Sequence, residues 1–182
     1  WPTSWIGQAQ ERFFQRLYAG VPFWTVSEST RQQLLAHGAR DVRVWPNGTD
    51  TEPLPTLPAK RLGAPLRLIA LARLAPNKRV DHVVRALALL CEQGCAAELT
   101  IIGWGQDQWR LEAQVNELGL SDAVTFAGRL DDAEKNAELQ KAHLLLHTSM
   151  REGWGLNVIE ANAMGTPAVV YPVGGLVDST VH

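Results

Sequence analysis

The sequence predicts an α/β fold in which a parallel β-sheet carries helices on both faces. The main observation is a regular alternation after residue 65, where five short apolar segments alternate with four segments whose apolar residues recur at helical spacing. Connections of this kind make the strands parallel and place helices on both faces of the sheet. The composition, 46% hydrophobic and 20% charged, is typical of a globular domain.

Residues 1–65 precede this pattern and contain short elements followed by a linker. The expected elements are a helix over 5–19, a strand over 23–26, a helix from the capping residue Ser27 to about His37, and a strand over 42–45. Four prolines then fall between residues 51 and 65, with little hydrophobic periodicity. This segment is therefore predicted to be a fairly stiff linker.

The regular part predicts the sheet and its helices in chain order. Strands are expected over 66–72, 99–102, 124–127, 144–147 and 167–171, and helices over 78–93, 106–118, 131–141 and 156–164. The first helix has valines and leucines on one face, the second stops at Gly119, and Asp131 or Asp132 can cap the third. Ligands of such sheets bind in the crevice outside the carboxyl ends of the strands.

Glycines and charged residues gather where these predicted strands end. They are Arg73 with Lys78 five residues later, Gly103 and Gly105, Gly128 and Arg129, the segment from His147 to Gly155, and Gly174 with Gly175. An arginine and a lysine at one edge of the sheet are suitable partners for a diphosphate. The alternative is that both cations are ordinary surface charges.

The segment from Glu152 to Gly165 is the most informative part of the chain. Seven residues separate Glu152 from Glu160, and Glu160 lies in a helix that is otherwise almost apolar. A buried carboxylate needs a partner, which a ligand can provide. Two residues eight positions apart on a helix point in directions about 80° apart around its axis. The helix N-terminus, which lies between the two acids, favours an anion. This pattern predicts a nucleotide-sugar site; the alternative is a structural joint with a solvated Glu152 and a salt-bridged Glu160.

Several other classes of function are disfavoured. A net charge of −2 gives no electrostatic argument for nucleic acid, and no apolar run approaches the ~20 residues that span a bilayer. The Gly-x-Gly at residues 103–105 lacks the third glycine of a dinucleotide fingerprint, because position 108 is Gln108. Cys91 and Cys95 are expected to be free thiols in a reducing, cytoplasmic environment, and no metal site is expected.

Taken together, these motifs resemble those of retaining glycosyltransferases of the GT-B type, in the large group often called GT4. The resemblance covers roughly residue 22 to the C-terminus. It rests on the segments Val44–Asp50, Ala72–Asp81, Val124–Gly128 and Glu152–Gly165, and on Gly174 with Gly175. It implies a Rossmann-like sheet that forms the C-terminal, donor-binding half of a GT-B fold.

The resemblance also implies roles for individual residues. Arg73 and Lys78 would hold the donor diphosphate, Glu160 the ribose, and Glu152 the donor sugar near the reacting centre. The residues that would complete the donor site are the backbone of Gly153, Trp154, Gly155 and Leu156, which would face the sugar and phosphates, and Arg129 and Leu130, which would border the base. Arg79 replaces the glycine that usually follows the lysine, and it would either crowd the phosphate loop or add a cation.

The resemblance finally implies a domain division. Residues 1–50 would be the tail of an N-terminal acceptor domain, residues 51–65 the linker, and residues 66–182 a donor-binding domain truncated at its C-terminus. The expected activity is metal-independent transfer of a sugar, with retention, from a nucleotide-sugar donor to an unknown saccharide, lipid or small molecule. By itself the chain is expected to bind donor without transferring it, and membrane contact would come only through the missing domain. A GT-B sugar-nucleotide epimerase and a binding domain without catalysis stay open as alternatives.

Overall fold

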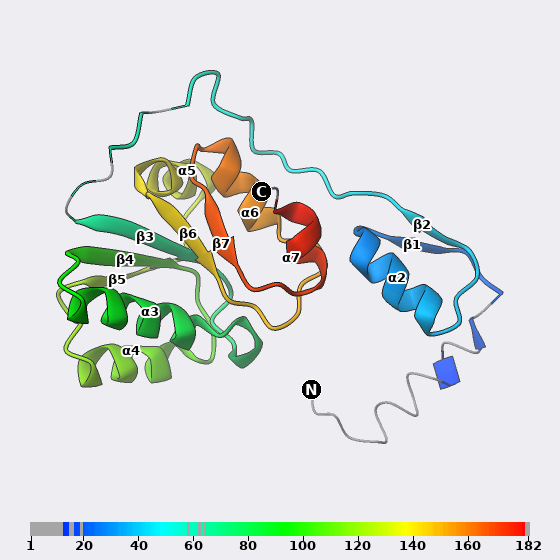
Figure 1. The fold of residues 1–182 in the computed structure, drawn as a ribbon, viewed down its shortest axis with the longest axis horizontal. Helices are drawn as coiled ribbons and strands as arrows, with labels where there is room; N and C mark the ends of the chain where they lie inside the picture. Colours follow the sequence, from blue (N-terminus) through cyan, green and yellow to red (C-terminus); the bar gives the residue numbers. More distant parts are fainter. Residues whose placement is uncertain are drawn as a thin grey trace.

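The computed structural model describes residues 13–14, 17–18, 20–57, 59–61, 63 and 65–180, so most of the helix expected over residues 5–19 lies outside the described residues. The predicted α/β architecture is confirmed (Figure 1). One five-stranded sheet consists of β3 Leu66–Leu71, β4 Ala97–Ile102, β5 Val124–Gly128, β6 Leu144–His147 and β7 Ala168–Val170. All neighbouring strands are parallel.

The order of the strands places the first one in the centre of the sheet. The order is β5-β4-β3-β6-β7. Strands β4 and β5 therefore lie on one side of β3, and the later strands β6 and β7 lie on its other side. The point where the direction reverses lies between β3 and β6. In parallel α/β sheets this is where a crevice opens at the carboxyl ends of the strands.

Helices cover both faces of this sheet (Figure 1). One face carries α3 Val80–Glu92 and α4 Gln108–Glu117, and the other carries α5 Asp132–Lys141, α6 Leu156–Ala163 and α7 Gly174–Ser179. Successive residues of a strand point to opposite faces. Leu68 and Ala70 of β3 are therefore buried with α3 and α4, whereas Ile69 is buried with the helices of the other face.

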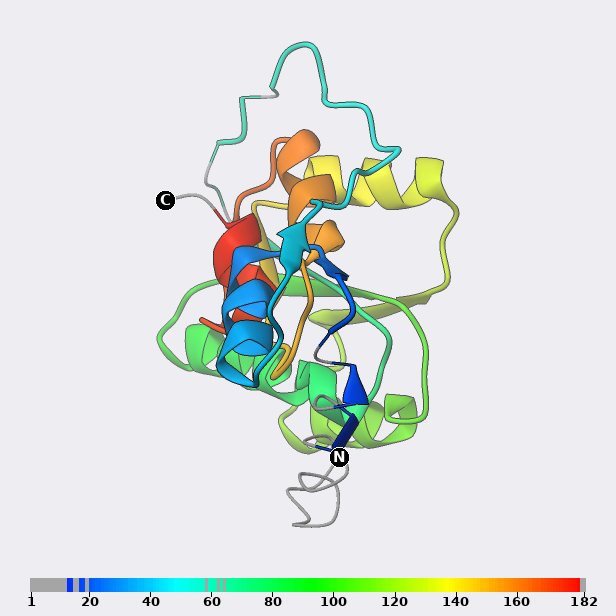
Figure 2. The same ribbon diagram turned by 90° about the vertical axis from the view of Figure 1, so that its right-hand side faces the viewer.

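The N-terminal part forms a separate small unit of two parallel strands and one helix. Its elements are β1 Phe23–Thr25, α2 Glu28–Ala36 and β2 Val42–Val44. The Ser27 side chain caps α2 as expected, by accepting from the Thr30 amide. At the same helix end, the Ser29 amide donates to Asp178 Oδ2 at 3.1 Å, which joins this unit to α7 (Figure 2).

The proline-rich linker is bonded to the main sheet domain along its path over α5 and α6 (Figure 2). The Leu54 amide donates to the carbonyl of Ala163, and the Lys60 ammonium donates to the carbonyl of Ala142 at 2.7 Å and to that of Leu139 at 3.3 Å. Burial lowers the pKa of Lys60, and the charge of Arg67 adds to the effect. The lysine thus takes up carbonyl groups that the end of α5 leaves free.

Two elements differ from the sequence prediction. The helix expected from residue 78 begins only at Val80, after a 3₁₀ turn over Pro76–Lys78. Arg79 separates the two with a left-handed backbone at φ 49°, which interrupts helical geometry. Helix α7 was not expected, because the two glycines at its start are poor helix formers.

Gly103 is required by a close backbone contact. A side chain at this position would place its Cβ 1.9 Å from the carbonyl oxygen of Ala72, and its φ is +131°. The same loop passes over Gly105, where a Cβ would lie 2.1 Å from the carbonyl oxygen of Leu74. From the sequence alone, this Gly-x-Gly is only weak evidence for a ligand site. In the structure, its two glycines let the loop that follows β3 pack directly against the backbone of this segment.

We expect Gly103→Ala to reduce the free energy of unfolding by roughly 3 kcal/mol or more, because it combines backbone strain with a backbone clash. Gly94→Ala is the matched control: Gly94 also has positive φ, +80°, but its Cβ would meet nothing within 4 Å. That variant should lose only about 1 kcal/mol. Denaturant unfolding measures both, and equal losses would show that the contact with Ala72 does not matter.

Candidate functional site

Three adjoining cavities follow the carboxyl edge of the sheet. The Glu152 cavity, about 320 Å³, is lined by Val26, Asn47, Lys78, His147 and residues 152–157. The Glu160 cavity, about 230 Å³, is lined by residues 48–51, Asp132, Lys135, Asn136, Leu156 and Glu160. The Trp104 cavity, about 460 Å³, is lined by residues 71–73, 102–104 and 128–130 and by Lys135. Leu156 is shared by the first two and Lys135 by the last two.

Two side chains lie close to the same oxygen of Glu152: Lys78 donates a hydrogen bond to it, and His147 faces it without one. Lys78 Nζ lies 2.5 Å from Glu152 Oε2, and His147 Nε2 lies 3.4 Å from that atom. The side chains of Glu152 and Lys78 are 22% and 20% exposed. The neighbouring His147 imidazole and the Lys78 ammonium outweigh the effect of burial and lower the pKa of Glu152 to about 2. Glu152 is therefore a partly buried anion and not the solvated side chain of the structural alternative.

The loop that carries Glu152 is tied to its neighbours through the backbone. The Thr148 hydroxyl donates to the carbonyls of Lys78 and Arg79, and the Met150 amide donates to the carbonyl of Asn77. On its other side, a Cβ at Gly175 would lie 2.0 Å from the carbonyl oxygen of Gly153. The glycine pair at 174–175 therefore lets α7 pack directly on this loop.

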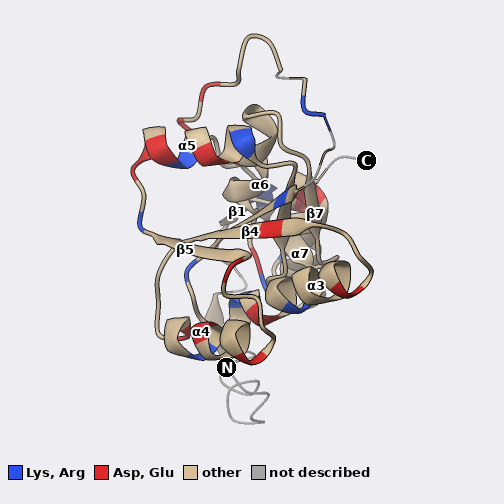
Figure 3. Cartoon of the chain, turned by 90° about the vertical axis from the view of Figure 1, so that its left-hand side faces the viewer, with Lys and Arg blue, Asp and Glu red and all other residues tan. Residues whose placement is uncertain are grey.

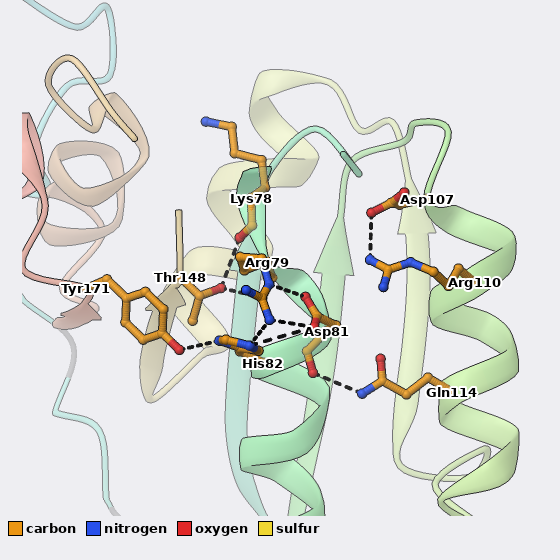
Figure 4. A network of polar contacts seen from close by, with 9 residues as sticks. All are labelled: Lys78, Arg79, Asp81, His82, Asp107, Arg110, Gln114, Thr148 and Tyr171. Atoms are coloured by element: carbon orange, nitrogen blue, oxygen red, sulfur yellow. Dashed lines mark hydrogen bonds and ion pairs between the residues drawn. The ribbon is translucent and has the colours of Figure 1, made fainter. Parts of the chain in front are cut away.

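Arg79 points away from Lys78 and into a separate network (Figure 4). Its guanidinium bonds both carboxylate oxygens of Asp81, at 3.1 and 3.2 Å, and contacts His82. His82 Nδ1 lies 2.5 Å from the hydroxyl of Tyr171. Burial raises the pKa of Asp81, but the bonds and charge of Arg79 outweigh it and keep that pKa below the usual value. Arg79 therefore stabilises the first turn of α3 through its contacts with Asp81 and His82.

Glu160 also has a lysine partner in the protein, so it is salt-bridged as the structural alternative expected. Lys135 Nζ lies 3.0 Å from Glu160 Oε1 and 2.9 Å from Asp132 Oδ1. Burial lowers the pKa of Lys135, but its bonds to Asp132 and Glu160 outweigh this, so the net shift is upward. Basic and acidic residues are interspersed along α5, as the colours of the ribbon show in Figure 3. Lys135 was not predicted as a site residue, although its position four residues before buried Leu139 indicates that it lies on the packed face of the helix.

The Trp104 cavity combines an aromatic ring with three cations. The guanidinium of Arg129 lies 5.2 Å from the centre of the Trp104 ring, and Arg73 and Lys135 also line the cavity. Among the described residues, no carboxylate lines this cavity. Trp104 was not predicted as a site residue; an aromatic residue between two glycines at a strand end is the signal that would have found it.

The predicted site residues thus share one edge but not one cavity. The Glu152 cavity is lined by the predicted residues Lys78, Glu152, Gly153, Trp154, Gly155 and Leu156, and the Glu160 cavity by Leu156 and Glu160. Arg73, Arg129 and Leu130 line the Trp104 cavity, so Arg73 and Lys78 stand in different cavities. Gly155, at φ +84°, is the N-cap of α6, and Leu156, the first residue of that helix, lines both of the first two cavities.

The described residues contain neither a metal-binding cluster nor a membrane-spanning helix. No three His, Cys, Asp or Glu side chains in that part of the chain converge closely enough to hold a metal ion. None of its helices combines the length and the apolar composition needed to cross a bilayer.

Glu152 should make the fold sensitive to acid. Its pKa is depressed in the folded protein, so its ionised form stabilises the fold at neutral pH, and this contribution is lost as the pH falls from about 4.5 to about 2. We expect Glu152→Gln to lower the free energy of unfolding at pH 7 by on the order of 1–3 kcal/mol and to flatten its decline over that interval. Glu117→Gln, at an exposed position on α4, is the control. Identical acid unfolding curves for wild type and Glu152→Gln would contradict the assignment.

Comparisons with known proteins agree with the fold and with the family resemblance. The family model described as glycosyl transferases group 1 matches residues 60–182. The 2-deoxystreptamine glucosyltransferase of Streptomyces kanamyceticus is 34% identical over 94% of this chain and 47% of its own length. The glycogen synthase of Mycobacterium tuberculosis is 31% identical over 99% of this chain and 45% of its own. The chain therefore spans about half the length of these relatives.

Solved structures of GT-B glycosyltransferases share the fold. Staphylococcus aureus TarM has a TM-score of 0.76 at 20% identity, over 91% of this chain and 33% of its own. Anabaena HepE, in a structure with UDP and glucose, has a TM-score of 0.73 at 20% identity, over 94% of this chain and 51% of its own. With the family model matching more than half of its residues, the chain belongs to the group 1 glycosyl transferases, and its Rossmann-like sheet domain shares its fold with part of these GT-B enzymes.

Proposed function

We propose that this chain binds the donor of a retaining, GT4-type glycosyltransferase, which transfers a sugar from a nucleoside-diphosphate sugar to an acceptor. The observation that supports it most is the pair of lysine-held carboxylates, Glu152 and Glu160, in adjoining cavities on either side of Leu156. A ligand with two groups of hydroxyls separated by an anion matches this arrangement. A nucleotide sugar has this form, with its diphosphate between the sugar and the ribose.

Each part of the donor has a proposed partner. Glu152 accepts from hydroxyls of the sugar, and Glu160 accepts from those of the ribose. The diphosphate crosses the first turn of α6, where free amides and the helix dipole favour an anion. Arg73 and Lys78 approach it from the cavities on the two sides, and Arg129 and Leu130 border the base in the Trp104 cavity.

The charges suit the breaking of the bond between sugar and diphosphate. Negative charge develops on the leaving phosphate, where Arg73, Lys78 and the α6 amides stabilise it. Positive character develops on the sugar ring, next to Glu152, whose depressed pKa keeps it ionised. Because these groups supply the positive charge beside the phosphates, the proposal requires no metal or other cofactor.

The acceptor is proposed to approach from the side of the N-terminal unit. Residues 47–51 contribute to the lining of the Glu152 and Glu160 cavities, which supports assigning residues 1–50 to an acceptor domain. Residues 51–65 then form the linker, and residues 66–182 form the donor domain. The two free thiols, Cys91 and Cys95, support a cytoplasmic location.

The first test concerns the diphosphate. Arg73→Ala and Lys78→Ala should each weaken binding of the preferred nucleoside diphosphate, chosen from UDP, GDP and ADP, by about 1.5–3 kcal/mol, the range for hydrogen bonds to charged groups. Titration calorimetry measures the loss. Arg85→Ala removes an exposed cation on α3, away from these cavities, and should bind as the wild type does. Unchanged affinity in both Arg73→Ala and Lys78→Ala would contradict the assignment of the diphosphate site.

The second test separates the two acids. Glu160→Gln should weaken the free nucleotide and the nucleotide sugar to the same degree, because both contain the ribose. Glu152→Gln should leave the free nucleotide unaffected and weaken only the nucleotide sugar. The comparison needs dissociation constants of both ligands for both variants, and equal losses of the two ligands in Glu152→Gln would contradict the sugar-side assignment.

A further inference from the structure

His147 is a buried side chain at the site with no hydrogen bond in the described part of the chain. It is the last residue of β6, is 6% exposed, and lines the Glu152 cavity. Neither Nδ1 nor Nε2 has a hydrogen-bond partner among the described residues. A buried polar group without a partner costs roughly 1–3 kcal/mol. Such a group in a binding cavity points to a role that a bound ligand completes.

The two oxygens of Glu152 are placed differently. Oε2 receives Lys78 Nζ at 2.5 Å and faces His147 Nε2 at 3.4 Å. Oε1 accepts no hydrogen bond from the described residues, and the Glu152 side chain lines the cavity. An ionised carboxylate only accepts hydrogen bonds, so Oε1 is the atom that can receive a hydroxyl of a ligand.

Lys78 has two possible anionic partners once a donor is bound. One is Glu152, which it contacts here, and the other is the donor diphosphate assigned to it above. A lysine is a mobile point charge on a flexible stem, and it moves toward a phosphate that enters its reach. When it does, His147 is the neighbour that still faces Oε2 of Glu152.

We propose that His147 is a positioning residue for the donor sugar. Its Nε2–H donates to Glu152 Oε2 when the nucleotide sugar binds, and this bond keeps Oε1 turned toward a sugar hydroxyl. The distance of 3.4 Å then shortens to hydrogen-bond length, as bonds in ligand-free sites commonly do when the ligand arrives. The inference rests on the proposed function, because it concerns the sugar side of the same site.

Substitutions that mimic one ring nitrogen at a time test this geometry. The amide nitrogen of glutamine lies close to the place of Nε2, and that of asparagine close to the place of Nδ1. His147→Leu should bind UDP within about twofold of wild type and bind UDP-glucose at least about tenfold more weakly. His147→Gln should recover most of this loss, whereas His147→Asn should not. The same series is run with GDP and GDP-mannose.

His143→Leu provides the structural control. His143 is also buried, at 5% exposure, and directly precedes β6, but its Nδ1 accepts from the Arg67 amide at 2.9 Å. This variant should lose thermal stability without discriminating between the nucleotide and its sugar conjugate. Thermal unfolding of every variant separates folding defects from binding defects.

A ligand-independent readout completes the experiment. Nitrogen NMR of the wild-type chain should show hydrogen on Nε2 of His147, and hydrogen on Nδ1 alone would overturn the inference. Equal losses of UDP and UDP-glucose in His147→Leu, or equal rescue by asparagine and glutamine, would also overturn it while leaving the proposed function intact. Failure of the wild type to bind any nucleotide would instead overturn the proposed function, and this inference with it.

Discussion

Backbone packed against backbone at the carboxyl edge of the sheet determines where the site residues lie. The loop after β3 packs against Gly103 and Gly105, and the loop after β6 packs against Gly175. At each of these glycines a Cβ atom would clash with a backbone carbonyl of the loop. These contacts fix the loops that carry Arg73, Lys78 and Glu152. Packing this close leaves little freedom to adjust, so a small displacement of one loop shifts every charged group attached to it.

The charges on this edge are satisfied within the protein before any ligand enters. Lys78 neutralises Glu152 and Lys135 neutralises Glu160, and both acids are less than a quarter exposed. An unpaired carboxylate at that depth would be costly, whereas a paired one remains ionised. A donor must therefore compete with, or be added to, contacts that already exist. Because each lysine holds only one oxygen of its carboxylate, the second oxygen stays available and the competition is partial.

The sequence was sufficient to predict most of the fold. Alternation of apolar strands with helical spacing located all five strands of the main sheet, and end signals such as Asp131, which caps α5, located the helices between them. It failed where tertiary contacts overrule local preference. Arg79 adopts a left-handed backbone where the distant Thr148 hydroxyl donates to its carbonyl, and α7 forms over two glycines where its backbone packs on the β6–α6 loop. Neither contact is visible in local sequence.

The candidate site shows a similar division. The spacing of Glu152 and Glu160 predicted that both acids face one molecule, and the structure separates them into two cavities that meet at Leu156. Lys135 was missed as a site residue because its partner Glu160 lies on another helix, 25 residues along the chain. His147 was recognised only as the end of a strand, because the sequence does not show that its ring faces Glu152 in the loop that follows. If one ligand reaches both acids, it must be extended and must cross the first turn of α6. An anionic group at its middle would then lie where the helix amides are free, which is why a sugar and a ribose joined by a diphosphate fit this edge better than a compact molecule would.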